Sequence, residues 1–240
     1  MTAPELVIFD LDGVLVDTQA AETGALGHLA RLMGVRLGGD EAADLFAGKR
    51  MADCIDAISE RAGAPPPPGA VELVRARCEE LIGDHLEPID GVREVVTAVD
   101  RLMCVASNSP RELIRRRVEA AGIAWAFGDR LFSAYDIGSW KPAPDLFLSA
   151  ARECGVPPAS CVVVEDSPVG VAAAIAAGMP VLRYGPDGSP ADPAAISPYL
   201  PPGTAVDGLT SFAKMADLPA LISHVPSPRA GTRQEISHDG

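Results

Sequence analysis

The sequence predicts an α/β fold with a doubly wound, mostly parallel sheet. Three short, unbroken apolar runs each stop abruptly at polar residues, which is typical of strands buried on both faces of a parallel sheet. Helical patterns follow these runs, so strands and helices alternate along much of the chain. Only 5% of the residues are aromatic, which favours a sheet covered by small-residue helices over an all-β sandwich.

The first expected strand covers residues 6–9 and ends at Asp10-Leu11-Asp12-Gly13. Alternate residues of an extended segment point the same way, so Asp10 and Asp12 can share one site. Such a pair can divide its chemistry, because one carboxylate attacks to form a covalent intermediate while the other gives up and takes back a proton. The alternative is a plain surface turn, since Asp and Gly are common turn residues.

Residues 18–87 are expected to form a separate helical insert, because apolar residues recur there at helical spacing and no strand pattern is present. Residues 65–68 are four prolines, which we interpret as an extended connector between two helices. The α/β core then consists of residues 1–17 and 88–224. The stretch 225–240 lacks periodicity and is expected to be a disordered tail.

The second half of the chain carries the remaining elements of the sheet. Ser-Pro pairs and glycines mark the starts and ends of its helices. Ligands of doubly wound sheets bind beyond the carboxyl ends of the strands, so polar residues that follow a strand mark the expected site. Strands are expected at residues 102–106, 130–134, 161–164 and 180–183, and helices at residues 110–121, 144–153 and 168–177.

Polar residues near these strand ends offer what phosphate chemistry requires. Glu165 and Asp166 supply the hard oxygen ligands that Mg²⁺ prefers, and the alternative is an acidic helix N-terminus favoured by the helix dipole. Ser107 and Asn108 supply a hydroxyl and backbone amides for phosphate oxygens, or an ordinary helix cap. Lys141 supplies a cation that can neutralise both a nucleophilic aspartate and a transferring phosphoryl group, whereas a lysine alone is usually solvated.

Four stretches of the chain follow one another in a characteristic order. They are Phe9-Asp10-Leu11-Asp12-Gly13-Val14-Leu15-Val16-Asp17-Thr18, Ser107-Asn108, Lys141-Pro142-Ala143-Pro144-Asp145, and Glu165-Asp166-Ser167 with Gly170. Together they resemble the motifs of the haloacid dehalogenase superfamily of phosphohydrolases, over about residues 5–185. The resemblance implies a Rossmann-like core with an α-helical cap domain inserted after the first strand, in agreement with the insert described above.

The resemblance also implies catalytic roles. Asp10 would be the nucleophile that forms an aspartyl-phosphate, and Asp12 would protonate the leaving oxygen and then activate water. Ser107, with Asn108, and Lys141 would bind the phosphoryl group and stabilise the charge of its transition state.

A Mg²⁺ cofactor is implied in the same way. It would be held by the side chains of Asp10 and Asp166 and by the backbone carbonyl of Asp12. Glu165 would be a further acidic contributor, either directly or through water.

Other branches of the superfamily fit the sequence less well. Haloalkanoic dehalogenases resemble one another in lacking the second aspartate and the metal site, so Asp12, Glu165 and Asp166 favour phosphate. A phosphonate-cleaving branch needs a cap lysine that forms an imine, but Lys49 lies beside Arg50 and is more typical of a solvated or phosphate-steering cation. We expect Lys49 and Arg50 to contact the substrate.

The main alternative is a mutase similar to β-phosphoglucomutase. Those mutases place a His in the hinge and a cap Arg shortly after a Gly, whereas this chain has Glu22 in the hinge and Lys49-Arg50 out of register after Gly48. A mutase must protect its aspartyl-phosphate from water, so these departures favour hydrolysis. A non-catalytic binding module on the same fold is a second alternative, but it would be expected to lack Asp10 or Asp12.

We therefore predict a Mg²⁺-dependent phosphatase for a small phosphorylated metabolite, either a sugar phosphate or a phosphorylated sugar acid. The stretch Phe132 to Ile137, leading to Trp140-Lys141, resembles that of sugar-acid phosphatases. The formal net charge of −13 argues against nucleic acid and anionic membrane surfaces as partners. We expect a monomer, with a dimer as the alternative.

The chain also carries indications about its cellular location. Its five cysteines are scattered and include no C-x-x-C pair, so buried free thiols are expected rather than disulfides or a zinc site. No signal-peptide pattern opens the sequence, and no apolar run approaches the roughly 20 residues that cross a bilayer. We expect a cytoplasmic protein.

Overall fold

A six-stranded sheet forms the centre of the protein. The computed structural model describes residues 3–46, 51–83, 86–206 and 208–225, without the side chains of residues 40, 43 and 44. The strand order is β3-β2-β1-β4-β5-β6, and these six strands pair with one another in parallel. The predicted α/β fold is confirmed. The strands are β1 (Leu6–Phe9), β2 (Leu102–Ser107), β3 (Leu131–Ser133), β4 (Cys161–Glu165), β5 (Val181–Tyr184) and β6 (Leu209–Phe212).

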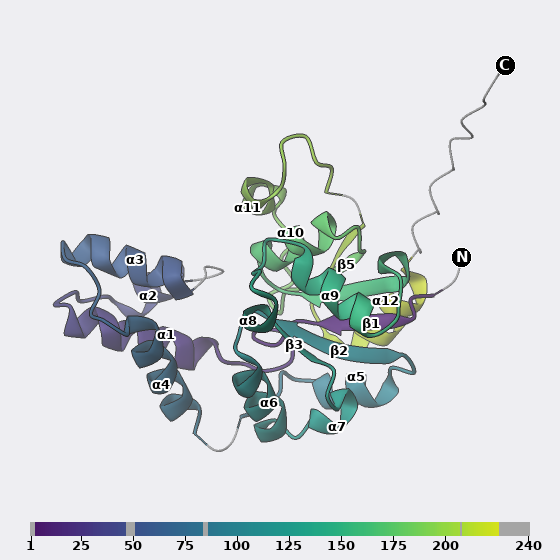
Figure 1. Ribbon diagram of the computed structural model, residues 1–240, viewed down its shortest axis with the longest axis horizontal. Coiled ribbons are helices and arrows are strands. Elements are labelled where there is room, and N and C mark those ends of the chain that lie inside the picture. The colour runs from purple at the N-terminus through teal and green to yellow at the C-terminus, as the bar shows by residue number, and fades with distance from the viewer. Residues whose placement is uncertain (1–2, 47–50, 84–85, 207, 226–240) are drawn as a thin grey trace.

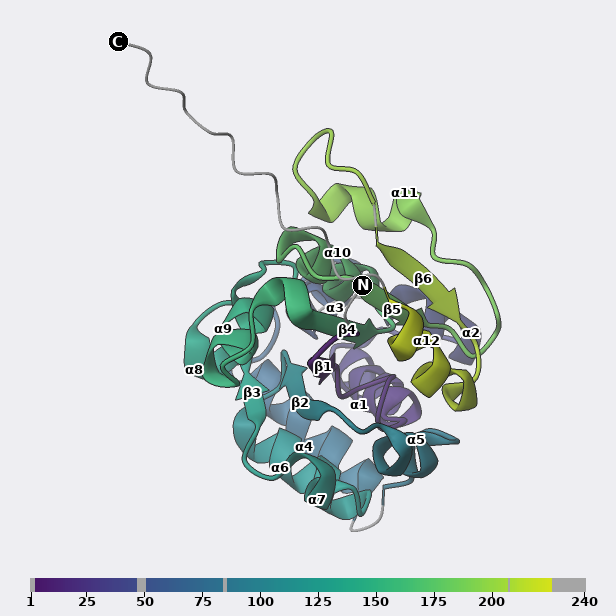
Figure 2. The same ribbon diagram turned by 90° about the vertical axis from the view of Figure 1, so that its right-hand side faces the viewer.

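Two layers of helices bury the sheet, as Figure 2 shows. Along β1, Val7 and Phe9 pack into one apolar layer, whereas Leu6 and Ile8 pack into the other. This alternation explains why all four residues of the strand are apolar. The first layer contains α5 (Val92–Ala98), α6 (Arg111–Ala120), α7 (Ala124–Phe127) and α12 (Leu218–His224), and the second contains α9 (Asp145–Glu153), α10 (Pro168–Ala176) and α11 (Pro193–Ile196).

Four helices form a separate bundle at one side of the sheet (Figure 1). They have an apolar cluster of their own, which explains how the predicted insert buries its helical faces. They are α1 (Gln19–Leu32), α2 (Gly39–Phe46), α3 (Met51–Ala62) and α4 (Ala70–Ile82).

The two connections between the bundle and the core lie side by side. Val16 forms an antiparallel bridge with Pro88, and the N–H of Ile89 donates to the carbonyl of Leu15 at 3.1 Å. The chain thus leaves the core and returns to it at one place. We propose on this basis that residues 1–17 and 88–224 are the core and that residues 18–87 are a cap domain.

Several elements differ from those expected. The strands β2 and β4 continue through Ser107 and Glu165, so these residues close the strands rather than follow them. The strand expected at residues 130–134 is shorter, because Ala134 begins α8 (Ala134–Ile137). The edge strand β6 was not predicted. Short 3₁₀ turns complete the structure at Pro158–Ser160, Ser197–Tyr199 and Met215–Asp217.

Two further expectations concern the thiols and the tail. All five cysteines are free thiols, and Cys154 is the one that is only partly buried. The predicted tail lies outside the described residues except for Val225. Among the helices that the structure describes, none combines the length and the apolar character needed to cross a membrane.

Candidate active site

Asp10 lies at the carboxyl end of the central strand. Its N–H donates to the carbonyl of Val164 at 2.9 Å, which continues the pairing of β1 with β4 by one residue. Its side chain is almost fully buried and accepts a hydrogen bond from Lys141 Nζ. Lys141 is only 2% exposed, and its Nζ also donates to Glu165 Oε1 at 2.8 Å. One buried cation therefore joins the carboxylates of two adjacent strands.

Three carboxylates form a group that can hold a metal ion. Oxygens of Asp10, Glu165 and Asp166 all lie within 4.8 Å of one another. Gly13 makes room for Asp166, since a Cβ at position 13 would stand 2.2 Å from Asp166 Oδ2. The backbone of Gly13 has a φ of +85°, a conformation that favours glycine. The Asp-x-Asp-Gly turn thus shapes the space beside the carboxylate of the opposite strand end.

Glu165 is held at both of its oxygens. Oε1 accepts from Lys141, while Oε2 accepts the N–H groups of Asp166 and Ser167, each at 2.8 Å, and the hydroxyl of Ser167 at 3.0 Å. A carboxylate with this many donors is well suited to fix Lys141 beside Asp10. Direct ligation of Mg²⁺ by Glu165 stays a prediction.

Negative charges outnumber positive charges around Asp10. Burial raises the pKa of the Asp10 carboxyl to about 7, against the lowering effect of Lys141, and Glu165 and Asp12 raise it further. Burial, followed by the charges of Glu165 and Asp10, also raises the pKa of Asp166 well above its ordinary value. A hard divalent cation would offset this excess of negative charge, so the donor set fits Mg²⁺.

The end of β2 is tied to Lys141 through Asn108. Asn108 Oδ1 accepts the backbone N–H of Lys141 at 3.0 Å, and Ser107 Oγ accepts the N–H of Ser109 at 3.1 Å. Ser133 donates its hydroxyl to the carbonyl of Ser109 at 2.7 Å. The loop predicted to bind phosphate is therefore fixed in place next to the buried cation.

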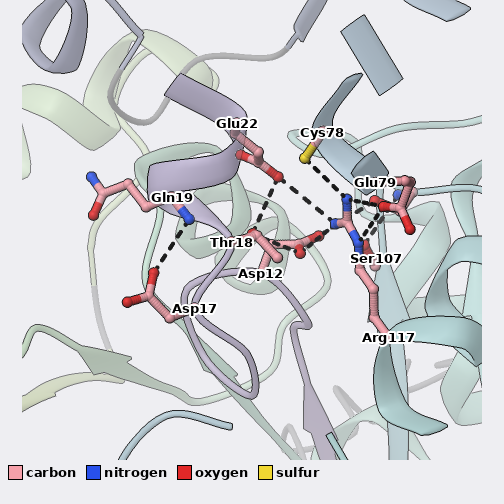
Figure 3. A network of polar contacts seen from close by, with 10 residues as sticks. Asp12, Asp17, Thr18, Gln19, Glu22, Cys78, Glu79, Ser107 and Arg117 are labelled. Carbon is pink, nitrogen blue, oxygen red and sulfur yellow. Dashed lines mark hydrogen bonds and ion pairs between the residues drawn. The ribbon is translucent and has the colours of Figure 1, made fainter. Parts of the chain in front are cut away.

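Asp12 has a different set of partners, which Figure 3 shows from close by. Its Oδ1 accepts a hydrogen bond from Arg117 Nη1 at 2.5 Å and lies 2.9 Å from the hydroxyl of Thr18. Its Oδ2 accepts the hydroxyl of Ser109 at 3.3 Å. The two aspartates of the first motif thus differ in environment, since Asp10 faces Lys141 and Asp12 faces Arg117.

Arg117 is the residue that the sequence interpretation missed. It is 4% exposed on α6 and lies at helical spacing between the buried residues Ile114, Val118 and Ala121. An arginine on the apolar face of a helix is unusual, because arginine is rarely buried without a charged partner. The position of Arg117 among apolar residues at helical spacing was the signal in the sequence that could have indicated a buried, paired arginine.

The structure brings seven of the nine predicted site residues to one edge of the sheet. Their individual roles stay predictions. The two predicted substrate contacts of the insert, Lys49 and Arg50, lie outside the described residues. The seven are Asp10, Asp12, Ser107, Asn108, Lys141, Glu165 and Asp166.

Comparison with known proteins agrees with this geometry. A family model described as haloacid dehalogenase-like hydrolase matches residues 4–178, which include all seven residues. The chain belongs to this family. The resemblance inferred from the four motifs is thereby confirmed.

Named members of the haloacid dehalogenase-like hydrolases match much of the chain. The 6-phosphogluconate phosphatase of Escherichia coli K12 is 32% identical over 222 residues, or 92% of this chain and 96% of that protein. The fructose-1-phosphate phosphatase YqaB of the same organism is 32% identical over 181 residues, or 72% of this chain and 92% of that protein. The predicted enzyme class, a hydrolase acting on phosphate monoesters, is confirmed by the family and these relatives.

A solved structure of the same family is also similar. It is a hydrolase from Deinococcus radiodurans R1 with bound phosphate and sodium, and its TM-score is 0.71. The identity is 28%, and the match covers 93% of this chain and 97% of that chain.

Proposed function

We propose that this hydrolase is a Mg²⁺-dependent phosphatase that acts on a sugar phosphate or a phosphorylated sugar acid through an aspartyl-phosphate on Asp10. The observation that carries the proposal is the buried contact of Asp10 with Lys141 inside a group of three carboxylates. A cation that is itself buried can stabilise the charge of a transferring phosphoryl group more strongly than a solvated one.

In the proposed first step, Asp10 attacks phosphorus, the bond from phosphorus to the ester oxygen breaks, and Asp12 gives a proton to the leaving alcohol. In the second step Asp12 takes a proton from water, which attacks the aspartyl-phosphate and frees inorganic phosphate and Asp10. Lys141 and Ser107 bind the phosphoryl oxygens throughout. Mg²⁺, held by Asp10, Asp166 and the carbonyl of Asp12, would supply neutralising charge.

The proposed substrate class rests on two observations. The relatives named above are phosphatases of a sugar-acid phosphate and a sugar phosphate. Close to Lys141 in the chain, the rings of Tyr135 and Trp140 pack edge to face, with their centroids 5.3 Å apart and both side chains partly exposed. Arg75 of α4 lies over the ring of Tyr135, 4.8 Å from its centroid. Aromatic rings can pack against the C–H groups of a sugar or sugar acid, and the nearby cation suits the negative charge of such a ligand.

The test is release of inorganic phosphate with and without Mg²⁺ from a panel of 6-phosphogluconate, fructose 1-phosphate, hexitol phosphates, phosphoglycolate and 4-nitrophenyl phosphate. We expect Mg²⁺-dependent release that Asp10→Asn abolishes, because the amide cannot act as the nucleophile. Release that survives in Asp10→Asn, or no release from any compound, would refute the proposal. Conversion of β-glucose 1-phosphate to glucose 6-phosphate faster than phosphate release would favour the mutase alternative.

A further inference from the structure

Arg117 contacts carboxylates from three separate segments of the chain. Nη1 lies 2.5 Å from Oδ1 of Asp12, which is in the core, and 3.8 Å from Oε1 of Glu22 in the first turns of α1. Nε and Nη2 donate to Oε1 of Glu79 on α4 at 3.2 and 2.9 Å, and Nη2 also reaches Cys78 Sγ at 3.7 Å. Nη1 thus faces Asp12 of the core and, at longer range, Glu22 of the insert, while Nε and Nη2 face Glu79 of the insert.

Charge balance alone does not explain this arrangement. A buried arginine is costly unless its partners are well placed, and pairing with Glu79 alone would satisfy that requirement. Arg117 instead directs Nη1 at Asp12, and Oε2 of Glu79 faces Arg116 at 3.4 Å. The guanidinium is therefore placed to bind Asp12 while Glu79 holds it from the opposite side.

We propose that Arg117 is a positioning residue for Asp12. By binding Oδ1 it fixes the orientation of the carboxylate and leaves Oδ2 facing Ser109, in the loop predicted to hold the phosphoryl group. Glu79, and at longer range Glu22, hold Arg117 in turn, so the orientation of Asp12 depends on the docking of the insert. This inference rests on the function proposed above, in which Asp12 is the proton donor.

The role predicts a dependence on the leaving group. A sugar alcohol leaves poorly without a proton, whereas 4-nitrophenolate leaves without one, so the first step needs a well-placed Asp12 only for the sugar phosphate. A misplaced proton donor should therefore slow phosphoryl transfer from the sugar phosphate selectively. A merely structural role of Arg117 would slow both substrates alike.

The experiment measures the first turnover with enzyme in excess and saturating Mg²⁺, on the full-length chain. The substrates are 4-nitrophenyl phosphate and the sugar phosphate of the panel that the wild type hydrolyses fastest. For Arg117→Gln we expect the rate of alcohol release to fall at least about tenfold more than the rate of nitrophenolate release. Arg117→Lys keeps the charge and should restore part of the loss. Arg116→Gln is the matched control, because Arg116 reaches Glu79 but is half exposed.

The outcomes are distinguishable. Equal losses for both substrates in Arg117→Gln, or an equally selective loss in Arg116→Gln, would overturn the inference while leaving the proposed function intact. A wild type that releases no phosphate would overturn both. If Arg117→Gln does not fold, Glu79→Gln is the second test, because it keeps both Arg117 and Asp12. A smaller loss of rate that is again selective for the sugar phosphate supports the inference. Equal losses of rate for both substrates contradict it.

Discussion

Gly170 packs directly against the carboxylate of Glu165: a Cβ at position 170 would stand 1.7 Å from Oε1, the atom that binds Lys141. Gly170 lies in α10, where alanine would otherwise stabilise the helix by about 1 kcal/mol. The glycine is therefore required by the neighbouring carboxylate and not by the helix.

We expect Gly170→Ala to lower kcat by at least about tenfold, because Glu165 must move and Lys141 loses its second partner. Steady-state rates of phosphate release check this. The control is Gly27→Ala on α1, where the new Cβ meets Arg31 at an ordinary 3.6 Å. Unchanged kcat in Gly170→Ala would show that catalysis does not depend on the position of the Glu165 carboxylate.

Lys141 should be required for stability as well as for activity. Removing it leaves Asp10 and Glu165 buried without their cation, so we expect Lys141→Met to lower the free energy of unfolding by about 3–5 kcal/mol at pH 8. Urea unfolding monitored by circular dichroism measures this. Adding Asp10→Asn should restore part of the loss, and Lys214→Met, at an exposed position, should have little effect. Equal losses of stability in Lys141→Met and Lys214→Met would contradict the prediction.

The raised pKa of Asp10 predicts a pH dependence in the metal-free protein. Between the ordinary value of 3.8 and about 7, the unfolded chain has released this proton and the folded chain has kept it. The protonated Asp10 carboxyl therefore stabilises the folded protein below about pH 4, and this stabilisation is lost as the pH rises to about 7.

Mg²⁺ has to displace the same proton. We expect titration with Mg²⁺ to release protons near pH 6 and far fewer near pH 8.5, as measured by calorimetry in buffers of different ionisation enthalpy. Asp10→Asn should lower the release near pH 6, and the remainder would come from Asp166, whose pKa is also raised. Equal release at both pH values would mean that Asp10 is already ionised without the metal.

Arg75 should affect binding more than catalysis. It contacts the ring of Tyr135, and we expect Arg75→Gln to raise the KM for the panel substrate that the wild type hydrolyses fastest about two- to fivefold, with kcat within about twofold of the wild type. Arg77→Gln is the control, since Arg77 lies on the same helix and pairs with the exposed Glu80. The same increase in both variants, or a loss confined to kcat, would argue against a role for Arg75 in recognition.

The centre of the fold and most of the site were predictable because local sequence determines them. A buried strand in a parallel sheet requires an apolar run such as residues 6–9, and polar residues such as Asp10 follow at its carboxyl end, where doubly wound sheets bind their ligands. Strand β6 lacks this signal. Its middle residues Thr210 and Ser211 are exposed at the edge of the sheet, so no apolar run marks it.

The contacts of Arg117 could not be predicted in the same way. It is the last of three consecutive arginines, and this run alone is typical of a solvated helix face. Its place on the apolar face of α6 sets it apart from Arg115 and Arg116, but its partners on α4 and in the first loop come together only on folding. Oε1 of Glu165 likewise obtains its partner, Lys141, from a segment that is adjacent only after folding, whereas Oε2 binds the next two residues of the chain.

The bridge between Val16 and Pro88 has a consequence for how such an enzyme can diversify. Because both ends of residues 18–87 meet at one place, the core treats this segment as a single long loop, and the entropy of closing a loop grows only with the logarithm of its length. The segment can be lengthened, shortened or exchanged at little expense to the sheet. Evolution can therefore remodel much of this segment while the sheet is inherited intact, provided that the partners of Arg117 at positions 22 and 79 are kept.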